Sequence, residues 1–298
     1  MSEITLLDGS IGQELVRRSG DRATPLWSTR VMIDRPALVE EVHRGYFDAG
    51  ATVATTNTYA VHRSRLERVG LQDQVLSLID VALTRAEAAR AAHGGGRIAG
   101  ALGPLLATYR PDLQPDPDEA QEKFGELIGA MEARVDLFLI ETVSSLLEAE
   151  GILRATARSA KPTWLAMTVD DDDGTRLRSG EPLADIAPLL DRFQPEAVLL
   201  NCSRPEAMTT GMEILAGFGR PFGGYANGFT RISEGFLKDA PTVDALEQRV
   251  DLGPGAYADH VMGWVDLGAS IVGGCCEVGP AHIAELARRL RAAGHNIV

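Results

Sequence analysis

Short apolar runs rich in β-branched residues alternate with longer amphipathic stretches along the whole chain. The short runs predict eight strands. They cover residues 4–7, 52–56, 97–101, 137–141, 163–168, 197–202, 222–225 and 270–273. Because the alternation continues to the end without a break in composition, we expect one domain over residues 1–298.

The longer stretches place apolar residues three and four positions apart, which is typical of helices packed on a sheet. Leu38, Val42 and Tyr46 show this spacing. The last stretch, residues 281–293, follows Pro280, which suits the first turn of a helix. It predicts a closing helix with Ile283, Leu286, Ala287 and Leu290 on one face.

Eight strand and helix units predict an α/β fold, a single-domain (β/α)₈ TIM barrel, with the active site at the carboxyl ends of the strands. A doubly wound parallel sheet is the rival fold. It is disfavoured because the first strand leads into DGSIGQEL, which lacks the glycine fingerprint of a dinucleotide site. Residues 111–117 (PDLQPDP) are expected to form a long loop over the active face.

The formal net charge of -13 argues against a nucleic-acid partner or an anionic membrane surface, since phosphate binding needs clustered basic residues. The amino terminus reaches a charged residue too early for a signal peptide, and no later apolar run approaches the ~20 residues of a membrane span. We therefore expect a cytoplasmic protein. The acidic run at residues 170–173 is expected to be a solvated turn. The oligomeric state does not follow from the sequence.

All three cysteines fall at predicted strand ends, Cys202 after one strand and Cys275 and Cys276 after another. In a barrel these ends converge on one mouth. We expect Gly273 and Gly274 to give the chain the freedom to bend so that both vicinal thiols face it. For Cys202 alone, the alternative is an ordinary buried cysteine. For the Cys275-Cys276 pair, the alternative is a vicinal disulfide, which would be strained.

Together the three thiols favour a zinc site. Zn²⁺ takes cysteine sulfur at ~2.3 Å in tetrahedral geometry and keeps a fourth position open when the site is catalytic. A substrate thiol in that position would lose its proton near neutral pH and become a nucleophile. The sequence thus predicts a metal that activates a thiol, with no separate general base.

Carboxylates also stand at predicted strand ends, Asp8 after ITLL and Glu141 after LFLI. Both would face the pocket, where they suit the ammonium group of an amino-acid substrate. For Asp8 the alternative is a turn or a helix cap. Polar residues 55–59, which include Asn57, are candidates for binding a substrate carboxylate or for forming the pocket floor. Asn201 is a candidate for orienting a ligand or the backbone. The histidines, at positions 43, 62, 93, 260, 282 and 295, show no paired metal spacing and are expected in surface or capping roles.

The chain contains, in this order, the segments LLDGSIGQEL, AGATVATTNTY, LFLIET, NCSRPE and GASIVGGCCEVGPAHI. These resemble the homocysteine S-methyltransferase family over nearly the whole chain. The resemblance implies a barrel that binds zinc through Cys202, Cys275 and Cys276 and transfers a methyl group to the thiol of homocysteine, giving methionine. It also implies substrate binding near the first and fourth strands, at Asp8, Gly9, Glu141 and Thr142.

Two departures from the family pattern lie beside the cysteines: Leu199-Leu200 before Asn201, and Glu277-Val278-Gly279 after Cys276. They bear on the methyl donor, for which the resemblance favours S-methylmethionine or S-adenosylmethionine. A betaine-type donor, a catabolic onium demethylase and a non-catalytic zinc- or thiol-binding barrel are the alternatives. Cationic donors need aromatic or acidic walls. The candidate aromatic residues are Tyr59, Tyr109, Trp164 and Tyr225.

Overall fold

The strands of the chain form a closed parallel barrel in a computed structural model that describes residues 2–20, 26–233, 235, 237 and 246–298. The strands are β1 (Glu3–Leu6), β2 (Val53–Thr55), β3 (Arg97–Leu102), β4 (Leu137–Val143), β5 (Thr163–Met167), β6 (Ala197–Asn201), β7 (Phe222–Tyr225) and β8 (Ile271–Val272). They pair in chain order from β2 to β8, and β8 pairs with β1. A parallel bridge between Leu7 and Val53 closes the ring, which confirms the predicted (β/α)₈ barrel.

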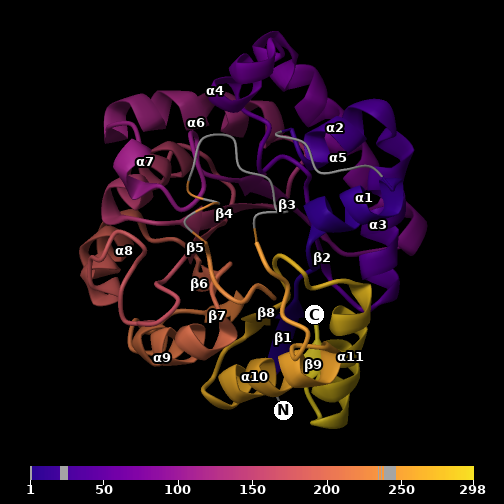
Figure 1. The fold of residues 1–298 in the computed structure, drawn as a ribbon, viewed down its shortest axis with the longest axis vertical. Helices are drawn as coiled ribbons and strands as arrows, with labels where there is room; N and C mark the ends of the chain where they lie inside the picture. The colour runs from indigo at the N-terminus through magenta and orange to yellow at the C-terminus, as the bar shows by residue number, and fades with distance from the viewer. Residues whose placement is uncertain (1, 21–25, 234, 236, 238–245) are drawn as a thin grey trace.

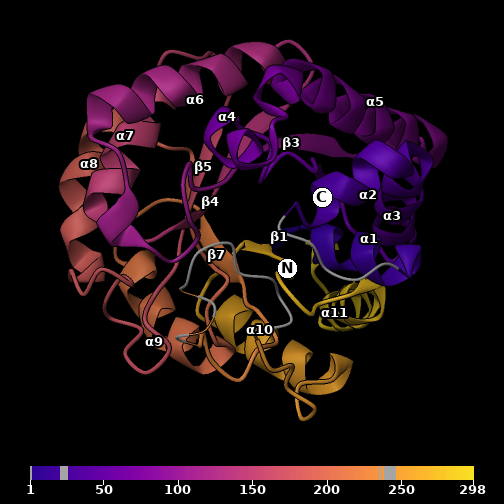
Figure 2. The same ribbon diagram turned by 45° about the horizontal axis from the view of Figure 1, so that its top comes forward.

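Helices surround this barrel on its outside (Figures 1 and 2). They are α1 (Ile11–Ser19), α2 (Ser28–Asp34), α3 (Pro36–Asp48), α4 (Arg63–Leu66), α5 (Val75–His93), α6 (Pro117–Met131), α7 (Leu146–Thr156), α8 (Ala187–Phe193), α9 (Pro205–Ala216), α10 (Pro254–Asp266) and α11 (Pro280–Ala292). Short 3₁₀ turns are η1 (Glu67–Val69), η2 (Gln72–Gln74), η3 (Pro111–Leu113) and η4 (Leu183–Ile186). The predicted closing helix is α11, and its four apolar residues are buried as expected.

The core has two parts because each strand is covered on both faces. Alternate residues of each strand face opposite sides of the sheet. One set, which includes Trp164, Leu139 and Leu199, packs inside the barrel. The other set packs against the helices in the larger cluster, which includes Phe138, Leu165 and most apolar helix residues. This rigid ring fixes the strand ends from which the candidate site is built.

Three details differ from the predicted strands. β4 runs two residues past Glu141 to Val143, and its register with β5 shifts between Ile140 and Val143. An additional short strand, β9 (Asn296–Ile297), pairs with β1 and brings the carboxyl terminus beside Ser2. The predicted loop at residues 111–117 contains one 3₁₀ turn, η3, and an irregular stretch over 114–116 that ends where α6 begins at Pro117.

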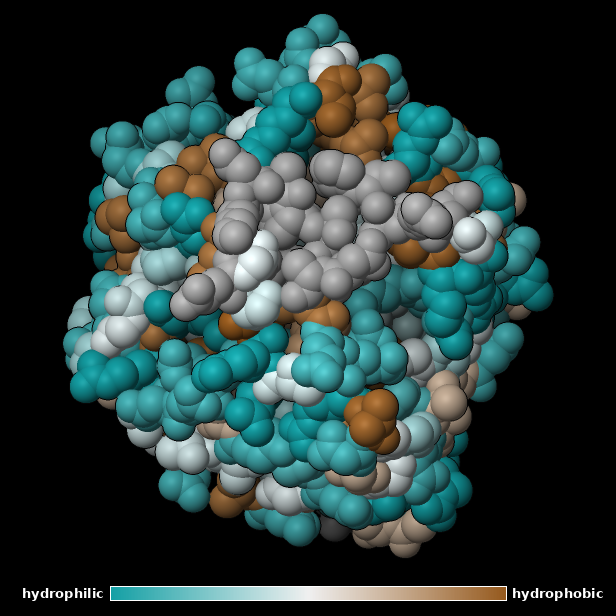
Figure 3. Space-filling view, in the orientation of Figure 1, coloured by the Kyte–Doolittle hydropathy of each residue, from teal (hydrophilic) through white to brown (hydrophobic). Residues whose placement is uncertain are grey.

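The surface is mainly polar over the described part of the face in Figure 3. Within the described ranges, no helix combines the length and the apolar character that a membrane crossing requires. The acidic run forms a turn, but the prediction that it is fully solvated is wrong for Asp171. This residue is buried and forms an ion pair with Arg178 at 2.7 Å, which offsets the cost of burying its charge.

Candidate metal centre and substrate pocket

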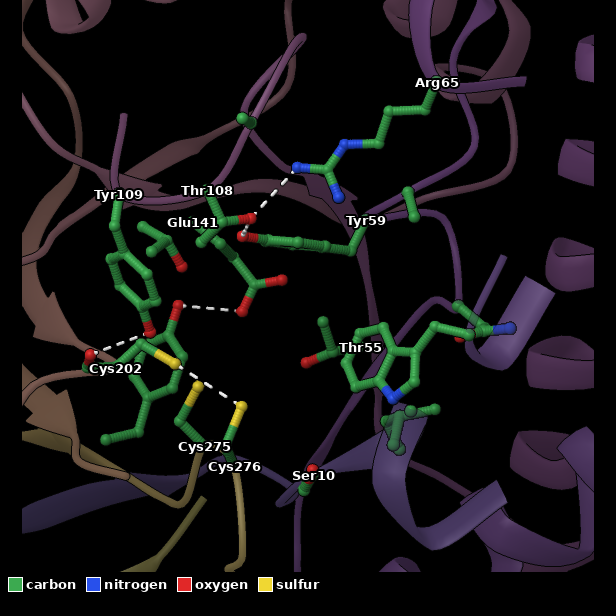
Figure 4. A pocket seen from close by; sticks show the side chains of 18 of the residues that line it. Ser10, Thr55, Tyr59, Arg65, Thr108, Tyr109, Glu141, Cys202, Cys275 and Cys276 are labelled. Carbon is green, nitrogen blue, oxygen red and sulfur yellow. Dashed lines mark hydrogen bonds between the residues drawn. The ribbon is translucent and has the colours of Figure 1, made fainter. Parts of the chain in front are cut away.

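The three cysteines meet at the mouth of the barrel (Figure 4). Their Sγ atoms lie within 4.8 Å of one another, and Sγ of Cys202 is 3.6 Å from Sγ of Cys276. Tetrahedral metal–sulfur bonds of about 2.3 Å place two sulfurs about 3.8 Å apart. The cluster therefore has the spacing of a metal site, and all three cysteines are free of disulfides.

Cys202 is held in an unusual backbone conformation just beyond β6. Its φ is 51°, in the left-handed region that non-glycine residues rarely adopt. Two side chains fix it there by donating to its carbonyl oxygen, Oη of Tyr109 at 3.1 Å and Nδ2 of Asn227 at 2.9 Å. Such strain persists where the surroundings determine it fully, as they do at many functional sites.

Cys275 and Cys276 stand in a turn after β8, and the expected role of the preceding glycines is corrected. Neither Gly273 nor Gly274 has a positive φ. Instead both leave space: a Cβ on Gly273 would lie 2.5 Å from Cβ of Leu7, and one on Gly274 would lie 2.1 Å from Cγ1 of Val278. Close packing against Leu7 and Val278, rather than a flexible bend, therefore demands glycine at these two positions.

The left-handed residue of this turn is Glu277, with a φ of 66°. The side chain of Gln13 secures it from α1. Oε1 of Gln13 accepts the backbone N–H of Glu277 at 2.6 Å, and Nε2 donates to the Glu277 carboxylate at 2.5 Å. The hydroxyl of Ser10 donates to the same Oε1 at 2.9 Å. The turn that carries two cysteines is thus tied to the segment that follows Asp8.

The three thiols are close enough to share hydrogen bonds, one of which joins Sγ of Cys202 and Sγ of Cys276 at 3.6 Å. Hydrogen bonds from Cys275 and Cys276 hold the pKa of the Cys202 thiol well below its ordinary value. Donation to Cys202 raises the pKa values of the Cys275 and Cys276 thiols, and burial raises them further. Three thiols at this spacing suit a cation at their centre, which would stabilise their thiolate forms.

Two carboxyl groups share the pocket with the sulfurs, Asp8 buried and Glu141 partly buried. Asp8 accepts hydrogen bonds from the backbone N–H of Thr55 at 2.6 Å and from its hydroxyl at 2.8 Å, and Glu141 accepts from Oη of Tyr225 at 3.1 Å. Burial raises the pKa of Asp8 to about 7 and that of Glu141 to about 8, with a further contribution to Glu141 from Asp8. Ionising both carboxyl groups at once is costly in this pocket. A positive group bound between them would lower that cost, so the two carboxyls form a binding site for a cation.

The remaining predicted site residues divide into pocket walls and supports. Gly9, Asn57 and Thr142 line the cavity, whereas Asn201 is not among its lining residues. Asn201 is fully buried and exchanges two hydrogen bonds with Thr142. Asn57 turns its amide towards α2, where Nδ2 donates to the carbonyl of Ser28 at 3.4 Å. Asn201 and Asn57 therefore position neighbouring segments in this structure.

The cavity encloses about 350 Å³ beside the sulfurs. Of the four aromatic candidates, Tyr59, Tyr109 and Tyr225 line it, but Trp164 does not, because its ring fills the inside of the barrel below. Trp27 lines the cavity as well, and its indole Nε1 is buried without a hydrogen-bond partner. The pocket therefore joins an acidic, sulfur-rich end to a partly aromatic wall.

Several residues that shape the site escaped the sequence analysis. Asn227, which donates to the carbonyl of Cys202, lies two residues beyond β7. Its position as a polar residue just after a strand, like that of Asp8, is the signal that could have found it. Gln13 lies inside a helix and gave no such signal. The expected surface or capping role is wrong for His43 and His62, which are buried. It is right for His282, whose Nδ1 accepts from the backbone N–H of Gly279 at the start of α11.

Comparison with known proteins agrees with this geometry. A family model described as homocysteine S-methyltransferase matches residues 5–290. The chain belongs to the homocysteine S-methyltransferase family. A homocysteine S-methyltransferase of Escherichia coli is 30% identical, and the match covers 96% of this chain and 95% of that protein. A Bacillus subtilis homocysteine S-methyltransferase is 27% identical over 95% of this chain and 93% of its own length.

A solved structure of a family member shows the same fold. The metallated form of the homocysteine methyltransferase MmuM from Escherichia coli superposes with a TM-score of 0.80 at 29% identity, and the match covers 96% of each chain. The resemblance inferred from the sequence segments is therefore confirmed. The homocysteine S-methyltransferase family consists of enzymes, so the cavity beside the cysteines is the candidate active site.

Proposed function

We propose that this enzyme transfers a methyl group from an onium donor to the thiol of L-homocysteine, giving methionine, with Zn²⁺ held by Cys202, Cys275 and Cys276. The observation that carries the proposal is the joining of two receptors in one cavity. Three sulfurs within 4.8 Å of one another line the same cavity as two carboxyl groups, those of Asp8 and Glu141. A ligand with a thiol at one end and an ammonium group at the other matches both.

The donor set fits zinc. Three sulfur ligands in a reducing compartment favour a soft or borderline metal, and three cysteines leave one tetrahedral position for a substrate atom. The E. coli relative with the same fold has been solved in a metallated form, which supports a metal here. Bound at this site, Zn²⁺ would lower the pKa of a substrate thiol and so supply the nucleophile.

The residues of the chain then bind and orient the substrates. Asp8 and Glu141 hold the homocysteine ammonium group, and the charge of this group favours their ionised forms. Gly9, Asn57 and Thr142 form the adjoining wall, and Asn201 fixes Thr142. Orientation of this kind converts an encounter of two substrates into a reaction within one complex.

The chemical step is an in-line displacement. A bond forms between the homocysteine sulfur and the methyl carbon while the bond from that carbon to the onium atom breaks. The bonding pair leaves with the onium atom, which becomes neutral, so no proton has to move in this step. S-methylmethionine and S-adenosylmethionine are the favoured donors, since both carry a methyl group on a positive sulfur.

An assay of methionine formation tests the proposal. The purified zinc-loaded enzyme is given homocysteine with S-methylmethionine, S-adenosylmethionine or betaine in parallel, and methionine is measured by mass spectrometry. We expect turnover with at least one sulfonium donor. Cys276→Ser should lose most of the zinc and essentially all turnover, while its circular dichroism stays unchanged. A mutant with full activity, or a wild-type enzyme that binds zinc but turns over no donor, would refute the proposal.

A further inference from the structure

The charged side chains that line the cavity are separated by sign. Glu141 lies on the side of the cysteines in Figure 4, and Asp8 is next to them because its carbonyl accepts the N–H of Gly274 at 3.0 Å. The lining cations come instead from the segments that follow β2 and β3: Arg65 in α4, Arg68 in η1 and Arg110 just before η3. Figure 4 shows Arg65 across Thr108 and Tyr59 from the cysteines. The pocket is therefore dipolar, negative at the sulfurs and positive at the opposite wall.

Arg65 is anchored in a defined position at this wall. Its Nη2 donates to Oγ1 of Thr108 at 3.0 Å and to the carbonyl of Pro104 at 3.2 Å. Oη of Tyr59 lies 2.9 Å from the same Thr108 hydroxyl, and the guanidinium carbon sits 5.5 Å from the centre of the Tyr59 ring. These contacts preorganise the guanidinium at the edge of the cavity.

Arg65 interacts electrostatically with the buried carboxyl group of Glu148, but no ion pair between Arg65 and a carboxylate is present within the described residues. The Nε of Arg65 is buried without a hydrogen-bond partner. Burial lowers the pKa of the guanidinium, which nevertheless stays charged in proteins. Arg68 is exposed on the same wall and adds a second positive charge, whereas Arg110 is neutralised by two hydrogen bonds to Asp112. A partly buried guanidinium that no carboxylate contacts directly favours a ligand that brings an anion to it.

We infer that Arg65, assisted by Arg68, binds the carboxylate of the methyl donor and thereby turns the onium methyl group towards the sulfurs. The inference rests on the proposed function and specifies its donor as an onium compound with a carboxylate. Such a zwitterion matches the dipolar pocket in only one orientation, with its positive end inward. An onium compound without a carboxylate leaves Arg65 unpaired and binds less well.

A comparison of donors with and without the carboxylate tests this assignment. S-methylmethionine and betaine are each assayed against their own carboxamides in wild type, Arg65→Gln and Arg65→Lys. The preference is the ratio of kcat/KM for the acid to kcat/KM for its carboxamide. Loss of a charge-assisted hydrogen bond in Arg65→Gln should reduce this ratio roughly ten- to a hundred-fold. Arg65→Lys, which retains a charge, should fall between Arg65→Gln and wild type. The KM for homocysteine should change less than the KM for the donor.

Arg63→Gln is the matched control, because Arg63 stands on the same helix α4 but pairs with Glu126 outside the cavity. It should keep the wild-type preference. Should Arg65→Gln fail to fold, Arg68→Gln remains, and its exposed position predicts a two- to five-fold loss of preference. Unchanged preference in both variants, or a change confined to the KM for homocysteine, overturns the inference.

Direct binding separates this inference from the proposed function. Calorimetric titration of S-methylmethionine should show weaker affinity for Arg65→Gln than for wild type, whether or not methionine forms. If no methionine forms but the two proteins still differ in affinity, the proposed function is refuted and the carboxylate site is supported. Equal affinities for the two proteins refute the site, even if methyl transfer is found.

Discussion

Thr142 and Asn201 are joined by two reciprocal hydrogen bonds at the ends of β4 and β6. The backbone N–H of Thr142 donates to Oδ1 of Asn201 at 2.9 Å, and Nδ2 of Asn201 donates to Oγ1 of Thr142 at 3.1 Å. Thr142 has a φ of 63°, and it follows Glu141 where β4 shifts register with β5. The amide of Asn201 thus supports Thr142, the residue beside a pocket carboxylate. Because Asn201 directly precedes Cys202, the same amide links this segment to the sulfur cluster.

Asn201→Ala should destabilise the enzyme and weaken substrate binding together. The substitution removes the acceptor of the Thr142 N–H and the amide donor to its hydroxyl in a buried site, which costs about 1–3 kcal/mol for each lost buried bond. Urea denaturation measures the loss, and the KM for homocysteine should rise because Glu141 is no longer held in place. Asn296→Ala, at an exposed position in β9, is the control and should alter neither quantity.

The carboxyl groups of the pocket should make the ligand-free protein less stable as the pH rises. The folded pKa values of about 7 for Asp8 and about 8 for Glu141 exceed the ordinary values of 3.8 and 4.5. A raised pKa means that folding favours the protonated form. The stability contributed by Asp8 is therefore complete below about pH 4 and is lost as the pH rises through 7.

Asp8→Asn isolates this effect. The free energy of unfolding of the variant, relative to wild type, should rise steadily between about pH 4 and pH 7, because only the wild type must ionise a buried carboxyl group. Asp185→Asn, which removes a carboxylate at an exposed position, is the control for the loss of one negative charge. A flat difference for Asp8→Asn would show that Asp8 is already ionised in the folded protein.

The same carboxyls should couple substrate binding to proton release. An ammonium ligand favours their ionised forms, so binding near pH 6 should release protons, and affinity should fall as the pH is lowered. The amino acid 2-aminobutyrate is a suitable probe because it lacks a thiol. Calorimetry in buffers of different ionisation enthalpy measures the protons released. Uptake of protons on binding would contradict the proposed ammonium site.

Much of the barrel follows from local sequence, because each strand is buried on both faces and reads as a short apolar run. The sulfur cluster follows as well, since parallel strands bring Cys202 and the Cys275-Cys276 pair to one mouth. The sequence does not reveal how the cysteines are held. The supports of Cys202 come from Tyr109 and Asn227, which are distant in the chain and become neighbours only when the barrel closes.

Backbone conformation was also beyond the sequence pattern. Thr142, Cys202 and Glu277 adopt left-handed conformations although none is glycine, so nothing in their residue types indicates a turn there. The strain is offset by tertiary hydrogen bonds, which a single sequence does not show. Conversely, the Gly273-Gly274 pair suggested flexibility, while the actual requirement is space against Leu7 and Val278.

Gly274→Ala should therefore damage the metal site through crowding. Its Cβ would fall 2.1 Å from Cγ1 of Val278, so the cysteine turn or the start of α11 must shift. We expect a loss of about 1–3 kcal/mol in the free energy of unfolding, with weaker metal binding. Gly129→Ala is the matched control: a Cβ there meets nothing within 4 Å on an exposed helix position, and the change should stabilise by about 0.5–1 kcal/mol.

The clamp between Gln13 and Glu277 should determine how tightly the metal is held. Gln13→Ala removes the acceptor of the Glu277 N–H and the donor to its carboxylate, so the strained turn that carries Cys276 is free to relax. We expect about a ten-fold loss of zinc affinity in competition with a chelator, since one or two part-buried hydrogen bonds contribute about 1–2 kcal/mol. Gln74→Ala, at an exposed position in η2, should bind zinc like wild type.

The variant Gln13→Glu distinguishes the clamp from simple packing. It keeps the size of the side chain and an acceptor for the Glu277 N–H, but it places a second carboxylate against that of Glu277. Repulsion between them should weaken zinc binding at least as much as Gln13→Ala does, although less volume is lost. Zinc affinity equal to wild type in Gln13→Glu would mean that the two side chains do not restrain the turn, and that the cluster is fixed by Asn227 and Tyr109 on the Cys202 side instead.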